Sequence, residues 1–208
     1  MTRCAKCRLG YSPEVPADRR LHRKIHDEAV FGVPGTIRRM DKVIWSDAFR
    51  KITVVRHRTA SLAERNRAER VAQWARQDTD FDFAAYHARD SDDGRDAHVS
   101  LLHEADRIVG FLVMERRDFT RKLTWSEWDD PTAKGPYSEM TRGAEMWSIG
   151  MIWVHVKHRR QGLATLLISQ AMKSLGTEME EVGWYTPFTE SSQALARKLC
   201  PTDFFVAK

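Results

Sequence analysis

The hydrophobic and polar positions of the chain form short apolar runs with two different spacings. Residues 51–56 are a β-branched run, and the apolar runs 98–103 and 108–115 are joined by four small or polar residues. Runs of this kind predict strands, and the last two are typical of a β-hairpin. In contrast, apolar residues three and four positions apart predict a helix over residues 62–76, with Ser61 as its cap.

The second half of the chain alternates strands and helices. An apolar run over residues 146–156 predicts a buried strand, and helical spacing over residues 162–175 follows it, with Gly176 as the stop. A further strand is expected over residues 182–186. After it, Thr189 or Ser191 begins a short helix over residues 192–199, and a last strand covers residues 203–207.

Three polar segments separate these elements. Residues 36–49 are expected to be a linker, and residues 77–96 a loop with one helical turn near residues 81–86. Residues 116–143 contain two prolines and two glycines, and we expect them to form a long surface insertion that could contribute to a substrate lid.

Cysteine, histidine and charged residues dominate the first 32 positions, and Pro34-Gly35 then interrupts the chain. We therefore expect a small module at residues 1–32 and a larger domain at residues 36–208. The 208 residues, 42% of them hydrophobic, suit one medium α/β domain with an appendage.

Charge and targeting signals narrow the functional classes. The formal net charge of +5 and the pI of about 9.2 favour anionic partners, so a weak association with nucleic acid stays open. No apolar stretch reaches the length of a membrane span, and the first residues lack the apolar core of a secretion signal. We expect an intracellular protein that does not associate with membranes.

The first 26 residues contain a C-x2-C pair and an H-x3-H pair with the spacing of a C2H2 zinc site. Cys4 and Cys7 form a tight knuckle, and His22 and His26 share one face of a helix. Two thiolates and two imidazoles can converge on one tetrahedral ion. Because DNA-reading fingers usually come in arrays, we predict a structural zinc ion that holds the module folded.

A basic turn between strand 146–156 and helix 162–175 carries the strongest chemical signal. The segment RRQGLA, residues 159–164, fits the pattern R-x-x-G-x-A. Gly162 lets an anion approach the backbone, and the first helical turn offers unpaired N–H groups. Arg159 and Arg160 add positive charge at the rim. These features indicate a turn that binds pyrophosphate and not merely an ordinary connection between a strand and a helix.

This strand, turn and helix resemble the acetyl-CoA-binding motif of the GNAT acetyltransferases. The resemblance implies the GNAT fold, an α/β (α+β) fold with a mixed central sheet flanked by helices. It also implies acetyl-CoA-dependent N-acetyltransferase activity, with pantetheine held by the strand and pyrophosphate by the turn. The positions carried over are Ile152, Trp153 and Val154 for pantetheine, and Arg159, Arg160, Gln161, Gly162, Leu163, Ala164 and Thr165 for pyrophosphate.

The N-terminal module makes the resemblance narrower. CAKCRLGYSPEVPADRRLHRKIH is similar to the zinc finger of the sister-chromatid cohesion establishment acetyltransferases, and IVGFLVMER, IWV and LARKLC resemble their later segments. The chain departs from that family where Gly150 replaces a serine, Thr186 an aspartate and Leu199 a tyrosine. The cofactor half of the site is therefore kept, whereas the acceptor half has changed.

Transfer of an acetyl group to an amine needs a base, a polarised carbonyl and a proton for the leaving thiolate. In GNAT enzymes a strand N–H polarises the carbonyl, and Val154 is the expected source. Glu145 is the first candidate for the base, Glu190 the second, and Tyr185 the candidate proton donor. The structural alternatives are two solvated surface carboxylates and a half-buried strand aromatic.

Three functional hypotheses follow. The first is acetylation of a primary amine, a lysine side chain of a protein, and the second is acetylation of a small-molecule amine on the same fold. The third is a non-catalytic module that binds acetyl-CoA or nucleic acid. A eukaryotic cohesion-type enzyme would be nuclear, and otherwise the protein would be cytoplasmic.

Overall fold

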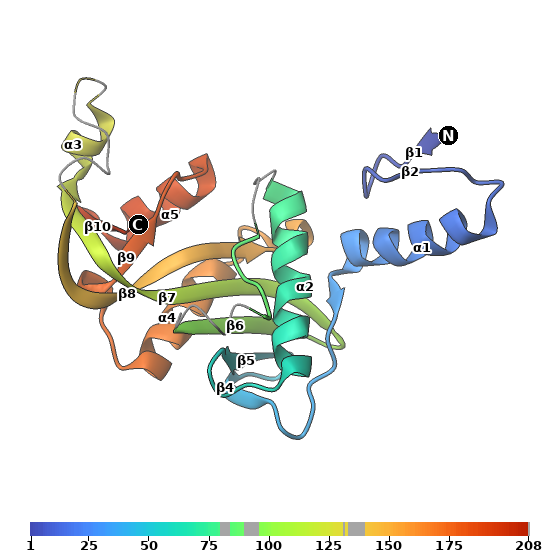
Figure 1. Ribbon diagram of the computed structural model, residues 1–208, viewed down its shortest axis with the longest axis horizontal. Coiled ribbons are helices and arrows are strands. Elements are labelled where there is room, and N and C mark those ends of the chain that lie inside the picture. The colour runs from blue at the N-terminus through green and yellow to red at the C-terminus, as the bar shows by residue number, and fades with distance from the viewer. Residues whose placement is uncertain (80–83, 90–95, 131, 133–139, 208) are drawn as a thin grey trace.

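The computed structural model describes residues 1–79, 84–89, 96–130, 132 and 140–207. A zinc-finger-like unit at the N-terminus projects from one end of a larger unit built on a twisted sheet (Figure 1). None of the described helices combines the length and the apolar composition that a membrane-spanning helix requires.

The larger unit contains a mixed sheet with the strand order β10-β9-β8-β7-β6-β5-β4, and β3 pairs with β7 beside this path. The bounds are β3 (Val33–Pro34), β4 (Lys42–Ser46), β5 (Arg50–Arg56), β6 (Ala97–Glu104), β7 (Arg107–Thr124), β8 (Thr141–Val154), β9 (Gly183–Tyr185) and β10 (Asp203–Ala207). Neighbours from β4 to β8 are antiparallel, whereas β9 is parallel to both β8 and β10.

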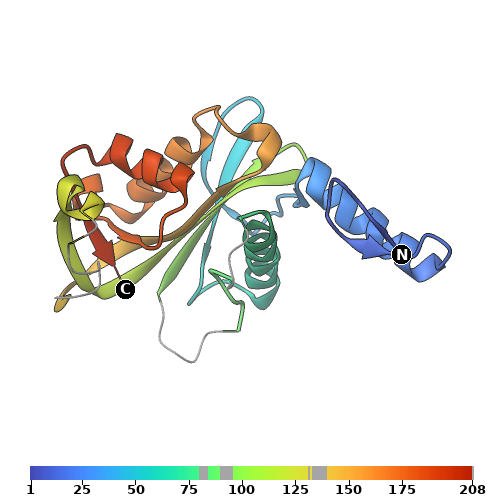
Figure 2. The same cartoon turned by 90° about the horizontal axis from the view of Figure 1, so that it is seen from above.

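Helices cover both faces of this sheet (Figure 2). Helix α2 (Leu62–Thr79) lies on one face, and α4 (Leu163–Leu175) and α5 (Glu190–Leu199) lie on the other. Side chains alternate along β7, so Phe111 packs with Val71 of α2 while its neighbour Leu112 packs with Leu167 of α4. Two hydrophobic cores therefore hold the sheet in place, and the fold is that expected of a GNAT acetyltransferase.

The predicted hairpin is present, with Glu104 opposite Arg107 across a two-residue turn. Helix α2 begins after Ser61, whose hydroxyl accepts a hydrogen bond from Glu64 N–H at 3.3 Å while the Glu64 carboxylate accepts one from Ser61 N–H at 2.8 Å. This capping box explains why the helix starts there. In the same way Thr189, not Ser191, caps α5 through Ser192 N–H.

Two expectations about polar segments were wrong. Residues 36–49 are not only a linker, because they contain the edge strand β4. Residues 116–143 are not one long surface insertion: β7 continues to Thr124, the short helix α3 (Trp125–Asp129) follows, and β8 begins at Thr141. Pairing with β10 explains the extension of β7, since Asp203 lies opposite Thr124 and Ala207 opposite Thr120.

Smaller differences concern boundaries. Strand β8 ends at Val154 and not at residue 156 as predicted, and a short 3-10 turn, η2 (Val156–His158), follows it. The helical turn expected near residues 81–86 falls partly outside the described residues, and the described residues 84–86 are not helical. The middle of the proposed lid, residue 131 and residues 133–139, also lies outside the described part of the chain.

The finger consists of β1 (Thr2–Arg3), β2 (Gly10–Tyr11) and α1 (Pro16–Phe31). The end of α1 is fastened to the larger unit by charged groups: Glu28 is buried and pairs with Arg70 and Trp74 of α2, and Asp27 pairs with Arg107 at 2.6 Å. The two units therefore have a defined contact rather than a free linker between them.

Candidate active site and zinc site

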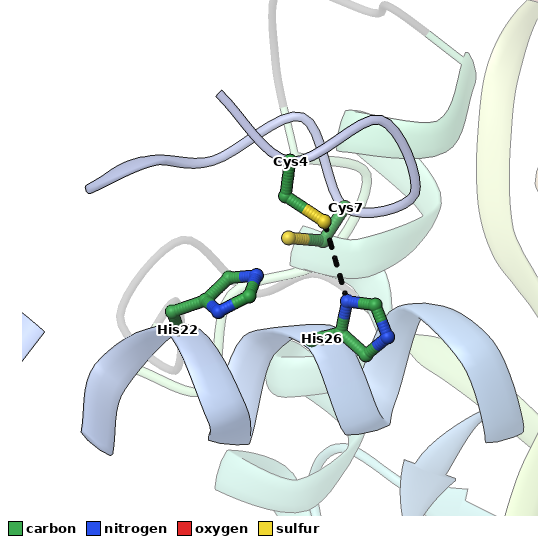
Figure 3. A group of neighbouring side chains, drawn as sticks. All are labelled: Cys4, Cys7, His22 and His26. Atoms are coloured by element: carbon green, nitrogen blue, oxygen red, sulfur yellow. Dashed lines mark hydrogen bonds between the residues drawn. The ribbon is translucent and has the colours of Figure 1, made fainter. Parts of the chain in front are cut away.

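The four predicted zinc ligands converge although they come from distant parts of the finger. Cys4 and Cys7 lie between β1 and β2, and His22 and His26 lie one turn apart on α1. Their ligand atoms are all within 4.8 Å of one another, and Cys4 Sγ is 3.3 Å from His26 Nδ1. Figure 3 shows the sulfurs and the imidazole rings pointing toward one another. A tetrahedral zinc ion separates its ligand atoms by roughly 3.5 Å, so this cluster fits zinc.

The electrostatics of the cluster also suit a metal. Hydrogen bonds from the Cys7 backbone and then from the His22 side chain lower the pKa of Cys4 from 9.0 to about 5, which favours the thiolate that binds zinc. Burial raises the pKa of Cys7, and a bound positive ion would act in the opposite direction by favouring the thiolate. The buried Nε2 of His22 has no hydrogen-bond partner among the described residues, a costly arrangement unless a ligand completes it.

In the larger unit, β8 and β9 separate after a very short pairing. They are hydrogen-bonded only where Ser148 lies opposite Gly183 and Ile149 opposite Trp184. Beyond this point β8 continues to Val154, paired with β7 alone. On its other side, the backbone of residues 150–154 presents N–H and C=O groups that no described strand satisfies. An extended ligand containing amides can pair with such an edge as an added strand would.

The separation begins at an irregularity of β8. Val113 of β7 lies opposite Met151, but Met114 lies opposite Ile149, so Gly150 is an extra residue without a partner. Bulges of this kind change the direction of a strand and are common next to active sites. Gly150, where the cohesion family has a serine, therefore lies at the point where the two strands diverge.

The basic turn lies beyond the free edge of β8. No side chain caps α4, and its first backbone hydrogen bond runs from Leu166 N–H to Gly162 C=O. The N–H groups at the start of the helix are therefore available to an anion. Arg160 and Gly162 have φ values of 64° and 76°, and a Cβ at Gly162 would meet nothing within 4 Å. This left-handed, open turn has the features of an anion-binding nest.

Side chains on either side of the turn are already engaged. Arg159 pairs with Asp78 at the end of α2 and donates to the Val154 C=O at 2.8 Å. Asp78 also accepts a hydrogen bond from Trp153 Nε1 at 2.8 Å. Arg159 therefore fixes the turn to the strand and to α2, whereas the Arg160 side chain has no partner among the described residues and is exposed.

A charged cluster that the sequence did not reveal lies beside the point of divergence. Glu115 is 6% exposed and lies opposite Ser148. Its carboxylate pairs with Arg117, whose guanidinium lies 5.6 Å from the centre of the Tyr185 ring. We call Glu115, Arg117 and Tyr185 the splay cluster. On β8, opposite Glu115, the buried Ser148 Oγ has no hydrogen-bond partner among the described residues.

The three predicted catalytic residues differ in their distance from this point. Tyr185 follows the last β8–β9 pair and lies beside the separation. Glu145 is exposed five residues before Gly150, about 16 Å away along an extended strand. Glu190 is exposed at the first position of α5. Of the acidic residues named here, the missed Glu115 has the shortest strand distance to the bulge. Its only sequence signal was a glutamate at the end of the apolar run IVGFLVME.

His155 follows β8 directly and shows how the finger meets this site. Burial lowers the pKa of this histidine, and its Nε2 is 3.0 Å from the Ala29 C=O of α1. The neighbouring Lys157 lies over the Phe31 ring at 4.8 Å. The residues between the free strand edge and the basic turn therefore contact the C-terminal end of α1.

The family model of the GNAT acetyltransferases matches residues 60–200, a segment that holds the strands, the bulge and the basic turn described above. The chain belongs to the GNAT acetyltransferase family. Residues 1–28 match a second model, described as the zinc finger of the acetyltransferase ESCO. This GNAT protein is thus an N-acetyltransferase that uses acetyl-CoA and has an ESCO-type zinc finger. Among curated proteins, no sequence matches it.

Solved structures of the xEco2 acetyltransferase domain share the fold. The domain bound to a K105-CoA conjugate has a TM-score of 0.60 and 21% identity, covering 82% of this chain and 98% of that one. A second structure of the xEco2 domain gives a TM-score of 0.60 at 20% identity, covering 83% and 98%. At these identities the likeness concerns the fold alone.

Proposed function

We propose that this GNAT enzyme transfers the acetyl group of acetyl-CoA to a lysine side chain of a protein. The observation that carries the proposal is the ESCO-type finger, held against the residues that lead into the basic turn. The xEco2 domain of the same fold was solved with a conjugate of CoA and K105. A finger fixed beside an active site adds surface for a large acceptor, which a small amine does not need.

For the cofactor, we assign the free edge of β8 to pantetheine and the turn to pyrophosphate. The pantetheine arm carries amide groups, which can pair with the backbone N–H and C=O groups that Ile152–Val154 present on the side of β8 away from β7. The pyrophosphate fits the N–H groups at the start of α4 and the charge of Arg160. Acetyl-CoA bound there would supply the thioester, with the backbone of β8 holding the arm between the turn and the bulge at Gly150.

For the acceptor, we assign the splay cluster. Of the acidic residues described above, Glu115 is the nearest to the bulge along the strands, so we assign its carboxylate as the base that takes a proton from the acceptor's ammonium group and leaves the neutral amine. Tyr185 offers a hydroxyl beside the diverging strands and is the proposed proton donor to the thiolate. Arg117 pairs with Glu115 and lies over the ring of Tyr185, so it holds these two side chains in one arrangement.

The second candidate is a small-molecule amine acceptor. It is favoured by the glycine at the bulge: a Cβ at Gly150 would meet nothing closer than 3.4 Å. A site that lacks the family's hydroxyl at this position has room for a different acceptor.

A side-by-side assay decides between the two. The purified enzyme is given acetyl-CoA with lysine-containing peptides, a cohesin head peptide or polyamines, and thiol release and product mass are measured. The proposal expects the highest kcat/KM with a lysine peptide, and less efficient transfer to the cohesin peptide because the acceptor residues differ. Faster transfer to a polyamine would establish the second candidate. If none of the acceptors in the panel supported thiol release, both candidates would be contradicted.

A further inference from the structure

Four basic side chains form an exposed stripe along the finger helix: Arg19, Arg20, Arg23 and Lys24. Positions 19 and 23, and positions 20 and 24, lie four residues apart, so the charges stack in two levels about 6 Å apart along α1. Within the described part of the chain, none of the four has an ion pair, a hydrogen bond or a ring contact from its side chain.

Two arginines of α2, in contrast, form ion pairs. There Arg67 pairs with Asp41 at 2.6 Å, and Arg70 pairs with Glu28. On the hairpin, Arg107 likewise pairs with Asp27. Like charges four residues apart destabilise a helix by a few tenths of a kcal/mol per pair. An uncompensated stripe on α1 therefore costs stability in the free protein, and an anionic partner would offset that cost.

The stripe is accessible and has a fixed direction. Figures 1 and 2 show α1 projecting away from the sheet and its helices. The four stripe residues are not members of the metal cluster, in which His22 and His26 face Cys4 and Cys7 (Figure 3). The pairs of Asp27 and Glu28 with the larger unit hold the end of the helix, so whatever binds the stripe lies at a constant position relative to the active site.

The chemistry of the stripe fits phosphates better than an acidic protein surface. Three of its four cations are arginines, which bind phosphate oxygens through two parallel hydrogen bonds. Among residues 19–24 the only exposed apolar side chain is Leu21, and none is Phe, Tyr or Trp, so the segment lacks an aromatic anchor for a protein partner or a platform for an unpaired base. We propose that the stripe binds the phosphate backbone of double-stranded DNA without reading its sequence. This contact keeps the acetyltransferase close to acceptors that are themselves bound to DNA.

The test uses the zinc-loaded full chain and a fluorescent 20-base-pair duplex, with Kd measured by anisotropy between 50 and 200 mM salt. Four phosphate contacts predict a slope of about −3.6 in log K against log salt. The stripe variant replaces all four residues: Arg19→Gln, Arg20→Gln, Arg23→Gln and Lys24→Gln. A control of equal charge change replaces exposed basic residues of the larger unit: Arg39→Gln, Lys51→Gln, Lys173→Gln and Lys198→Gln.

The proposal expects the stripe variant to bind DNA at least tenfold more weakly with a slope near zero, while the control keeps most of the affinity. The zinc content of the stripe variant and its rate of peptide acetylation should match those of the wild type. The proposal for DNA binding can then fail or hold independently of the proposed lysine acetyltransferase activity. Equal losses in both variants would mean that net charge alone binds DNA and would overturn the proposal. So would no binding by the wild type, or competition by polyglutamate as strong as that by unlabelled DNA at equal charge, which would assign the stripe to acidic proteins.

Discussion

The zinc finger and the catalytic domain are held together by different forces. Among residues 1–32, only Glu28 and Gly32 are buried, and both lie at the contact with the domain. The domain, by contrast, buries two hydrophobic clusters on the two faces of its sheet. A unit with almost no apolar core depends on its metal, whereas the domain depends on burial. Each can therefore be damaged without the same damage to the other.

The largest expected effect is that of zinc removal on the finger. Structural zinc contributes about 10–16 kcal/mol of apparent binding free energy in small fingers, so Cys7→Ser or chelation should unfold residues 1–32. The wild type should contain one zinc per chain, and amides of α1 should lose their protection from hydrogen exchange in the variant. Cys200→Ser is the matched control, because this buried cysteine lies far from the cluster in the larger unit. Wild-type protein without stoichiometric zinc would end this account of the finger.

The converse change is Leu167→Ala in the core of the domain. Leu167 is fully buried between α4 and the sheet, and truncation of such a residue costs about 2–5 kcal/mol. Urea unfolding can be followed by tryptophan fluorescence, because every tryptophan from Trp45 onward lies in the domain and, in the described part of the chain, only Trp74 is hydrogen-bonded to the finger, through Glu28. The zinc content of the folded variant should not change. Loss of zinc together with domain stability would show that the two units are one cooperative structure.

Acid should weaken the domain through two buried histidines. Burial lowers the pKa of His98 and of His103 from 6.5 to about 4. Because both are lowered in the folded state, their neutral forms support folding above pH 6.5, and that support is lost as the pH falls toward 4. Each contributes on the order of 3 kcal/mol over this window. His103→Asn should flatten the dependence of the unfolding free energy on pH by about half, and an unchanged slope would exclude this histidine as a cause.

The smallest of these effects is that of Glu115, in the proposed acceptor site, on the rate of acetyl transfer. We expect Glu115→Gln to lower kcat/KM at least tenfold, about 1.4 kcal/mol in the transition state, because it removes the carboxylate beside the bulge. The matched change Glu145→Gln should stay within twofold, since Glu145 is exposed on β8 about 16 Å before the bulge at Gly150, where β8 and β9 diverge. Circular dichroism controls for folding. Equal rates for wild type and Glu115→Gln, with a slow Glu145→Gln, would return the base to Glu145.

The contrast between the two units also explains what the sequence could predict. The zinc ligands and the basic turn depend on spacing within one helix or one turn, so Cys4, His22 and Gly162 could be found without a fold. The splay cluster depends on the register of three strands, and Glu115 meets Tyr185 only through Arg117 across β8. The polar end of β7 carried no apolar run, and its pairing with β10 brings together residues about 80 positions apart. Such pairing cannot be deduced from local pattern.

The central claim is that the free edge of β8 and the turn before α4 bind acetyl-CoA. Calorimetry of acetyl-CoA with the wild type and with Gly162→Glu tests it most directly. The glutamate places a negative charge where we assign the pyrophosphate, at a position whose φ of 76° also disfavours a side chain. We predict saturable 1:1 binding by the wild type and a Kd at least tenfold higher for the variant, about 1.4 kcal/mol. No binding by the wild type, or the same affinity in both proteins, would contradict the account.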